Sequence, residues 1–157
     1  MRNKFAKKVI LVINGPNMNL LGKRKPEIYG NKSLLDLEAS IADHYKDQDI
    51  SLKFFQTNHE GEIIDKIQES DFLIYDTGED LRCGIVINPG AYAHSSYAIR
   101  DAIEAIQTPV VEVHLSDIDN REEFRKNMVI SDVCKKTIVG KGIEGYFEAI
   151  DYLLANK

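Results

Sequence analysis

Glu112 and His114 are a carboxylate and an imidazole separated by one residue within an apolar run, residues 109–115. Side chains two positions apart in a strand point to the same face, so the carboxylate would lie beside the ring. A carboxylate there fixes which ring nitrogen carries the proton and stabilises the protonated ring. The spacing therefore indicates a general acid or base, with a purely structural histidine as the alternative.

Arg24 and Tyr29 lie on one short segment, residues 22–30, which is bracketed by Gly22 and Gly30. A phenol with its ordinary pKa of about 10 is a poor base at neutral pH. A guanidinium group close to it would lower that pKa. Two flanking glycines suit a mobile lid that brings both groups over a substrate. The alternative is a solvated basic loop.

His94 directly precedes Ser95, where the sequence predicts the start of a helix, so His94 either serves a site or belongs to the helix cap. A metal site is not expected. His94, His114 and Glu112 would be its only obvious ligands, and no closely spaced ligand pair is present.

The segment Gly140-Lys141-Gly142-Ile143-Glu144-Gly145 matches the G-x-G-x-x-G pattern of dinucleotide-binding loops. Such a loop needs a second strand and an acidic residue about 20 positions further on. The chain after Gly145 is too short for either, so the pattern indicates a tight turn between a strand and a helix.

Apolar runs alternate with helical patterns along the chain. Five runs are predicted as strands: residues 9–13, 50–56, 85–87, 109–115 and 137–139. Helical periodicity marks a helix capped by Ser33, with Asp36 three residues on. It also marks residues 60–70, 95–107 and 143–155, and a short turn over 121–126. Residues 72–75 look like a further strand, and the stretch 71–83 is interpreted as a surface excursion. This alternation predicts an α/β fold, a five-stranded parallel sheet with helices on both faces.

Polar side chains follow three of these strands. Ligands of open α/β sheets bind beyond the carboxyl ends of the strands. The residues expected to meet there are two amides, two imidazoles and a hydroxyl: Asn17, Asn88, His94, His114 and Ser116.

Composition narrows the class of protein. The 157 residues suit one domain, 1–157, and the net charge of −5 argues against a nucleic-acid partner without excluding an acidic substrate. No apolar run is long enough to span a bilayer. The basic start leads into only five apolar residues, which favours a strand over a signal peptide. Cys83 and Cys134 have no CxxC spacing and are expected as reduced thiols in the cytoplasm.

Taken in order, the motifs resemble the type II 3-dehydroquinate dehydratases. They begin with Asn14-Gly15-Pro16-Asn17, then Gly22, Arg24, Pro26 and Tyr29-Gly30. Asn88-Pro89-Gly90-Ala91, His94-Ser95-Ser96 and Ile99-Arg100-Asp101 follow. Glu112-Val113-His114-Leu115-Ser116 precedes Arg121-Glu122-Glu123-Phe124-Arg125, and Gly140 to Tyr146 match the family's closing turn. The resemblance runs from about Val9 to the C-terminus.

The resemblance implies a flavodoxin-like fold and a lyase that dehydrates 3-dehydroquinate to 3-dehydroshikimate in the shikimate pathway. That pathway leads to chorismate and the aromatic amino acids. The resemblance also implies no metal or organic cofactor, no membrane partner, and a dodecamer built from trimers.

Catalytic roles follow from the same resemblance. Tyr29 would take the proton from the carbon beside the ketone, and Arg24 would depress its pKa and hold the lid. His114 would protonate the leaving hydroxyl, with Glu112 orienting it, and Asn17 would help stabilise the enolate.

Binding roles are implied as well. Three residues would hold the substrate carboxylate, the last two through backbone amides: Asn88, Leu115 and Ser116. His94 and Arg125 would hold ring hydroxyls, and Asp101 would reach a neighbouring subunit's site.

The sequence departs from the family pattern at Lys25, where an acidic residue is usual, at Asp117, where asparagine is usual, and in the length of 71–83. Three alternatives stay open: a flavin or nucleotide module, a receiver-like regulator, and a family member that has lost activity. The loop after the first strand lacks a phosphate-binding pattern, and Asn88 stands where a regulator needs aspartate.

Overall fold

A parallel β-sheet forms the centre of the protein. The structure is a computed structural model that describes residues 8–77 and 84–156. Its strands are β1 (Lys8–Asn14), β2 (Ile50–Gln56), β3 (Gly84–Asn88), β4 (Val110–His114) and β5 (Lys136–Val139). They lie in the order β2-β1-β3-β4-β5, and every neighbouring pair is parallel. The predicted five-stranded parallel sheet is confirmed.

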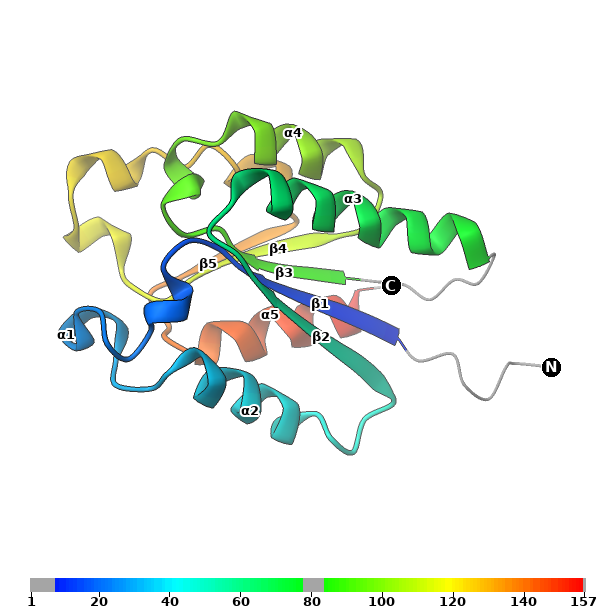
Figure 1. Ribbon diagram of the computed structural model, residues 1–157, viewed down its shortest axis with the longest axis horizontal. Helices are drawn as coiled ribbons and strands as arrows, with labels where there is room; N and C mark the ends of the chain where they lie inside the picture. The colour runs from blue at the N-terminus through cyan, green and yellow to red at the C-terminus, as the bar shows by residue number, and fades with distance from the viewer. Residues whose placement is uncertain (1–7, 78–83, 157) are drawn as a thin grey trace.

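Two helices cover each face of the sheet (Figure 1). Helices α2 (Leu34–His44) and α5 (Glu144–Ala155) pack on one face, and α3 (Glu60–Thr77) and α4 (Tyr97–Ala105) pack on the other. In β3, Val86 faces the first pair while Ile85 and Ile87 face the second. Because both faces are covered, the strands read as continuous apolar runs.

The start of α2 is confirmed in detail. Ser33 Oγ accepts a hydrogen bond from Asp36 N at 3.1 Å, and Asp36 Oδ2 accepts one from Ser33 N at 2.9 Å. This capping box satisfies two of the backbone N–H groups that a helix start leaves without partners.

The strand predicted at residues 72–75 is wrong, because α3 continues through them to Thr77. Neither glycine nor proline interrupts the pattern after Ser70, so the helix has no stop signal there. Asp71 Oδ1 instead ties the helix to the approach to β4, accepting bonds from Gln107 N at 3.1 Å and Thr108 N at 3.3 Å. The rest of the expected excursion, residues 78–83 with Cys83, lies outside the described residues.

The predicted cap of α4 is wrong by one residue. Ser96 Oγ, not Ser95, accepts the bond from Ile99 N at 3.0 Å. Ser95 follows a 3-10 turn, Gly90–His94, and donates its N–H back to Tyr92 O. His94 therefore belongs to that turn and not to the helix cap.

Short turns carry the loops beyond the strand ends. The loop after β1 holds a 3-10 turn, Met18–Leu20, and the short helix α1 (Pro26–Tyr29). The expected helical turn after β4 forms over Glu123–Lys126, with another at Ile118–Asn120 before it. A further turn, Ser131–Val133, leads into β5.

The glycine-rich segment before α5 is a turn packed on β4. Gly140 N donates to His114 O at 3.1 Å, and Gly142 N donates to Leu115 O at 3.2 Å. These N–H groups are occupied by the strand end, so they do not form a phosphate cradle. No described helix is both long and apolar enough to cross a membrane.

The loops after β1 and β3 pack backbone against backbone at the point where the strand order reverses. Gly15 N donates to Asn88 O at 2.8 Å, and a Cβ at Gly15 would lie only 2.7 Å from Pro89 O. A Cβ at Gly90, which has φ 59°, would lie 3.0 Å from Pro16 O. Reversal points of open α/β sheets are where ligands bind.

Candidate active site

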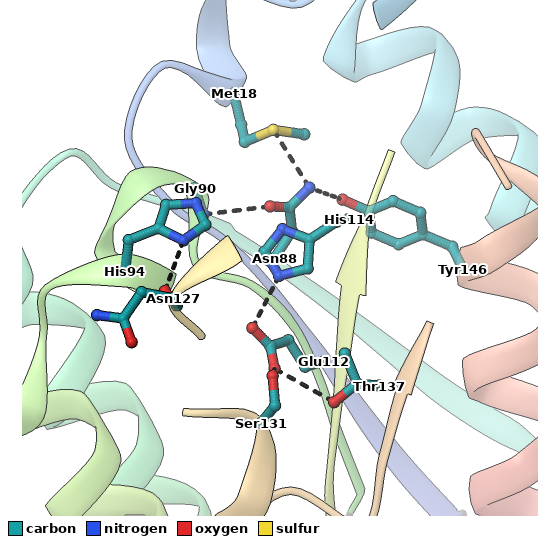
Figure 2. A network of polar contacts seen from close by, with 10 residues as sticks. All are labelled: Met18, Asn88, Gly90, His94, Glu112, His114, Asn127, Ser131, Thr137 and Tyr146. Atoms are coloured by element: carbon teal, nitrogen blue, oxygen red, sulfur yellow. Dashed lines mark hydrogen bonds and ion pairs between the residues drawn. The ribbon is translucent and has the colours of Figure 1, made fainter. Parts of the chain in front are cut away.

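His114 and Glu112 form the pair that the sequence predicts. His114 Nε2 lies 2.7 Å from Glu112 Oε1 (Figure 2). Both side chains alternate along β4 with Val111 and Val113, which pack with α2 and α5, so they lie on the opposite face, the one covered by α3 and α4. Because an ionised carboxylate only accepts, Nε2 carries the proton of this bond. The other ring nitrogen, Nδ1, then points away from Glu112.

Glu112 is completely buried and held by hydroxyl groups from two other segments. Its Oε2 accepts from Ser131 Oγ at 2.6 Å and from Thr137 Oγ1 at 3.3 Å (Figure 2). A buried carboxylate is tolerable only when such bonds replace its lost hydration. Neither Ser131 nor Thr137 was predicted as a site residue from the sequence, since neither lies in a motif of the family pattern.

His94 lies beside this pair, with its ring centroid 6.4 Å from that of His114. Its Nδ1 donates to Asn127 O at 3.0 Å (Figure 2). Burial lowers the pKa of His94, with smaller contributions from its electrostatic interactions with His114 and Arg125. A neutral ring that donates through Nδ1 presents Nε2 as an acceptor, which suits a hydroxyl group.

Asn88 ends β3 and is almost fully buried. Its Oδ1 accepts from Gly90 N at 3.2 Å, and its Nδ2 donates to Tyr146 Oη at 3.1 Å (Figure 2). The backbone bond requires the oxygen on one side of the amide, so the nitrogen must occupy the other.

Eight of the predicted site residues line one pocket at the carboxyl ends of β1, β3 and β4. They are Asn17, Arg24, Asn88, His94, His114, Leu115, Ser116 and Arg125. Glu112 lies behind His114. Asp101 is exposed on α4 and does not line this pocket. Tyr29 is the last residue of α1, five positions from Arg24, and its side chain lies outside the described part of the structure.

Asn17 turns the chain at the entrance to this pocket. Its backbone adopts the left-handed conformation, φ 68°, which asparagine tolerates better than most residues. Asn17 N donates to Asn58 Oδ1 at 3.1 Å, and this bond fixes the loop against the segment after β2.

Arg121 also lines the pocket, although no role for it was predicted from the sequence. Its side chain is 8% exposed, and its Nη1 donates to Ser116 Oγ at 3.2 Å. The signal was present, because Arg121 opens the motif that ends in Arg125. Among the residues that the structure describes, no aspartate or glutamate lines this pocket, whereas three arginines do, so its walls are positive in a protein of net charge −5.

Glu122 lies outside the pocket and forms ion pairs with Arg121 and Arg125, two of the arginines that line it. Its carboxylate lies 2.7 Å from Arg125 Nε and 3.5 Å from Arg121 Nε. A backbone hydrogen bond and the bond from Arg125 lower the pKa of Glu122 to about 2. The carboxylate is therefore ionised at neutral pH and orients both guanidinium groups.

A second hollow, of about 440 Å³, lies between Phe55 and α3. Its walls carry Glu62, Asp65 and Glu69, which would repel an anion. Within residues 8–77 and 84–156, no three His, Cys, Asp or Glu side chains are placed to share a metal ion. Cys134 is a free thiol, and burial raises its pKa.

The family model described as dehydroquinase class II matches residues 8–154 of this chain. A 3-dehydroquinate dehydratase of Clostridium botulinum is 52% identical over 147 residues, which cover 94% of this chain and 95% of the relative. That of Bacillus pumilus is 50% identical over 145 residues, covering 92% and 93%.

Solved structures agree with these relatives. A type II dehydroquinase from Butyrivibrio crossotus superposes with a TM-score of 0.86 at 49% identity, covering 95% of this chain and 99% of that one. One from Propionibacterium acnes gives 0.85 at 37% identity, covering 95% and 97%.

Proposed function

This chain belongs to the class II dehydroquinase family, and from that premise we propose that it dehydrates 3-dehydroquinate to 3-dehydroshikimate in the shikimate pathway. The observation that carries the proposal is the positive pocket that joins the His114–Glu112 pair to amides at the strand ends. Its charge suits a carboxylate substrate, and its acid–base pair suits an elimination.

The elimination needs a base, a stabilised enolate and an acid. A proton leaves the carbon beside the ketone, its electron pair forms the enolate, and collapse of the enolate expels the neighbouring hydroxyl as water. His114 supplies the proton to that hydroxyl. Glu112 stabilises the charged ring before the transfer and holds it in one orientation afterwards.

Tyr29 is the proposed base, with Arg24 as the cation that makes its phenolate accessible. Arg24 lines the pocket, and Tyr29, the last residue of α1, follows it by five positions in the sequence. An approaching guanidinium favours the phenolate, and exclusion of water strengthens that attraction. Asn17, on the same pocket wall, stabilises the enolate oxygen.

The remaining residues orient the substrate. Asn88 and the backbone amides of Leu115 and Ser116 hold the carboxylate at the ends of β3 and β4. His94 and Arg125 hold the ring hydroxyls, His94 through its accepting Nε2. We also propose that the protein assembles as a trimer-based dodecamer in which Asp101 reaches a neighbouring chain's site.

The reaction is tested by adding 3-dehydroquinate to the purified protein and following the ultraviolet absorbance of the conjugated enone. We expect the absorbance to rise with the native protein, with His114→Ala and Tyr29→Phe nearly inactive. Arg24→Ala should also lose most of kcat, and the double variant Arg24→Ala/Tyr29→Phe should be little worse than Tyr29→Phe, because both groups serve one proton transfer.

Two results would overturn the proposal. Native protein that produces no enone removes the assigned reaction. Near-normal kcat in Tyr29→Phe removes Tyr29 as the base and leaves α1 as a cover over the pocket.

A further inference from the structure

Three polar side chains form a buried chain of hydrogen bonds between β1, β3 and α5. Asn88 Nδ2 donates to Tyr146 Oη at 3.1 Å, and Tyr146 Oη donates to Asn14 Oδ1 at 2.6 Å. Asn14 and Tyr146 are completely buried. Burial also raises the pKa of Tyr146, so its hydroxyl keeps the proton that it donates.

The direction of this chain is fixed at one end by the backbone. Gly90 N can only donate, so it requires Oδ1 of Asn88 on its side. Asn88 Nδ2 then faces Tyr146, whose oxygen accepts and whose single proton must go to Asn14. Each bond allows only one orientation of the next group.

Stability alone does not account for this arrangement. Tyr146 lies in the apolar cluster formed by α2, α5 and the sheet. Among the described residues, Asn14 Nδ2 is buried without a hydrogen-bond partner. An unsatisfied buried donor destabilises a fold, and apolar side chains of similar shape would avoid that cost.

The Asn88 end of this series of hydrogen bonds faces the pocket. The second N–H of Asn88 Nδ2 meets the sulfur of Met18 at 3.5 Å, and Met18 and Asn88 both line the pocket (Figure 2). A thioether is a weak acceptor, so a carboxylate that enters would be a better partner for this N–H.

We propose that Tyr146, held by Asn14, is a positioning residue that acts together with the Gly90 N–H to keep the N–H of Asn88, and not its oxygen, turned to the substrate carboxylate. The inference rests on the proposed function and extends it to residues outside the pocket. An amide held by the Gly90 N–H alone is held at one point, so it turns more easily and offers its oxygen part of the time, and that oxygen would repel the carboxylate. By fixing the amide, Tyr146 strengthens binding of the substrate carboxylate, and it takes no part in the proton transfers.

The test compares Tyr146→Phe with Tyr45→Phe. Tyr45 is a matched control because it is also buried in the same apolar cluster and donates its hydroxyl, to Asp151 Oδ1 at 2.7 Å, away from the pocket. Both variants lose one buried hydroxyl and should lose similar thermal stability. We expect KM for 3-dehydroquinate to rise about tenfold in Tyr146→Phe alone, with kcat within about threefold of the native value.

Product inhibition gives an independent readout, because 3-dehydroshikimate carries the same carboxylate and its inhibition constant does not depend on the forward rate of dehydration. Its inhibition constant should rise in parallel with KM in Tyr146→Phe and stay unchanged in Tyr45→Phe. The inference is overturned if both constants stay within twofold of the native protein, or if kcat falls while they stay constant. Native protein without dehydratase activity would instead refute the proposed function, so the two failures are distinguishable.

Discussion

The buried carboxylate of Glu112 is held by His114 on its own strand and by two hydroxyl groups far from it in sequence. It accepts bonds from His114, Ser131 and Thr137, which come from β4, the turn before β5, and β5 itself. Hydrogen bonds to a charged acceptor are about twice as strong as those between neutral groups. The two hydroxyls therefore help to keep the charge that orients His114 inside the protein.

Replacing Ser131 with alanine is expected to lower kcat about tenfold or more, because its bond to Glu112 is the shorter of the two hydroxyl bonds. Thr137→Val removes the longer bond and should cost only a few-fold. Steady-state kinetics at saturating 3-dehydroquinate measure both. Ser70→Ala is the control, since Ser70 Oγ donates to Ile67 O within α3, away from the pocket. Equal kcat in Ser131→Ala and Ser70→Ala would contradict the role of Ser131.

His94 predicts a pH dependence of binding on the acid side. Because its pKa is lowered, the His94 ring of the folded protein stays neutral just below pH 6.5, where an ordinary histidine takes up a proton. The contribution of the neutral ring to stability is complete above that value and is lost as pH falls through the lowered pKa. KM should rise over the same interval, because a protonated ring cannot accept the substrate hydroxyl.

Measuring KM from pH 5 to pH 8 tests this expectation, with His94→Gln as the matched variant because glutamine accepts a hydrogen bond without titrating. A rise in KM that persists unchanged in His94→Gln would assign the titration to another group.

Residues within one element could be predicted, and residues that meet through space could not. Strand alternation placed Glu112 beside His114 because the two belong to one strand. Ser131 and Tyr146 reach Glu112 and Asn88 across 19 and 58 positions of sequence. No local pattern encodes such contacts. Arg121 lay within a motif but could not be assigned until the structure showed which way its side chain points.

At the scale of elements, the contact between the loops after β1 and β3 holds the pocket together. Gly15→Ala would place a methyl group 2.7 Å from Pro89 O and push the two loops apart. We expect a loss of more than about 2 kcal/mol of stability and a raised KM, since Asn88 moves with its strand. Gly61→Ala is the control: nothing lies within 4 Å of its added methyl on α3, so it should stabilise by about 0.5–1 kcal/mol.

Thermal unfolding followed by circular dichroism measures both glycine variants. A Gly15→Ala protein as stable as the native one would show that the loops can separate without cost.

The ends of helices were predicted best where the residues that start or stop the helix lie next to that end in the sequence. The Ser33 capping box marks the start of α2 in sequence and in structure. The run 72–75 failed because a short apolar segment does not distinguish strand from helix, and α3 had already begun upstream. Ser95 failed as a cap because the 3-10 turn before it delays the helix by one residue.

At the scale of the whole molecule, the position of Asp101 tests the proposed assembly. Asp101 lies on α4, exposed and off its own chain's pocket. If it completes a neighbouring site, Asp101→Ala should raise KM severalfold, whereas Glu104→Ala, an exposed acid on the same helix, should not. Light scattering should show native particles far above the 17.8 kDa of one chain. A fully active monomer would contradict the shared site.

The strand order has a consequence for how the protein folds during translation. β1 pairs first with β2, and β3, β4 and β5 are then added one after another at the other side of β1, in the order in which they are made. The sheet can thus grow outward during translation without rearranging. Tyr146, however, belongs to α5, the last element made, so a nascent chain that already carries every pocket residue still lacks the group that orients Asn88. We therefore expect full affinity for the substrate only after α5 has been made and packed, later than the pocket itself.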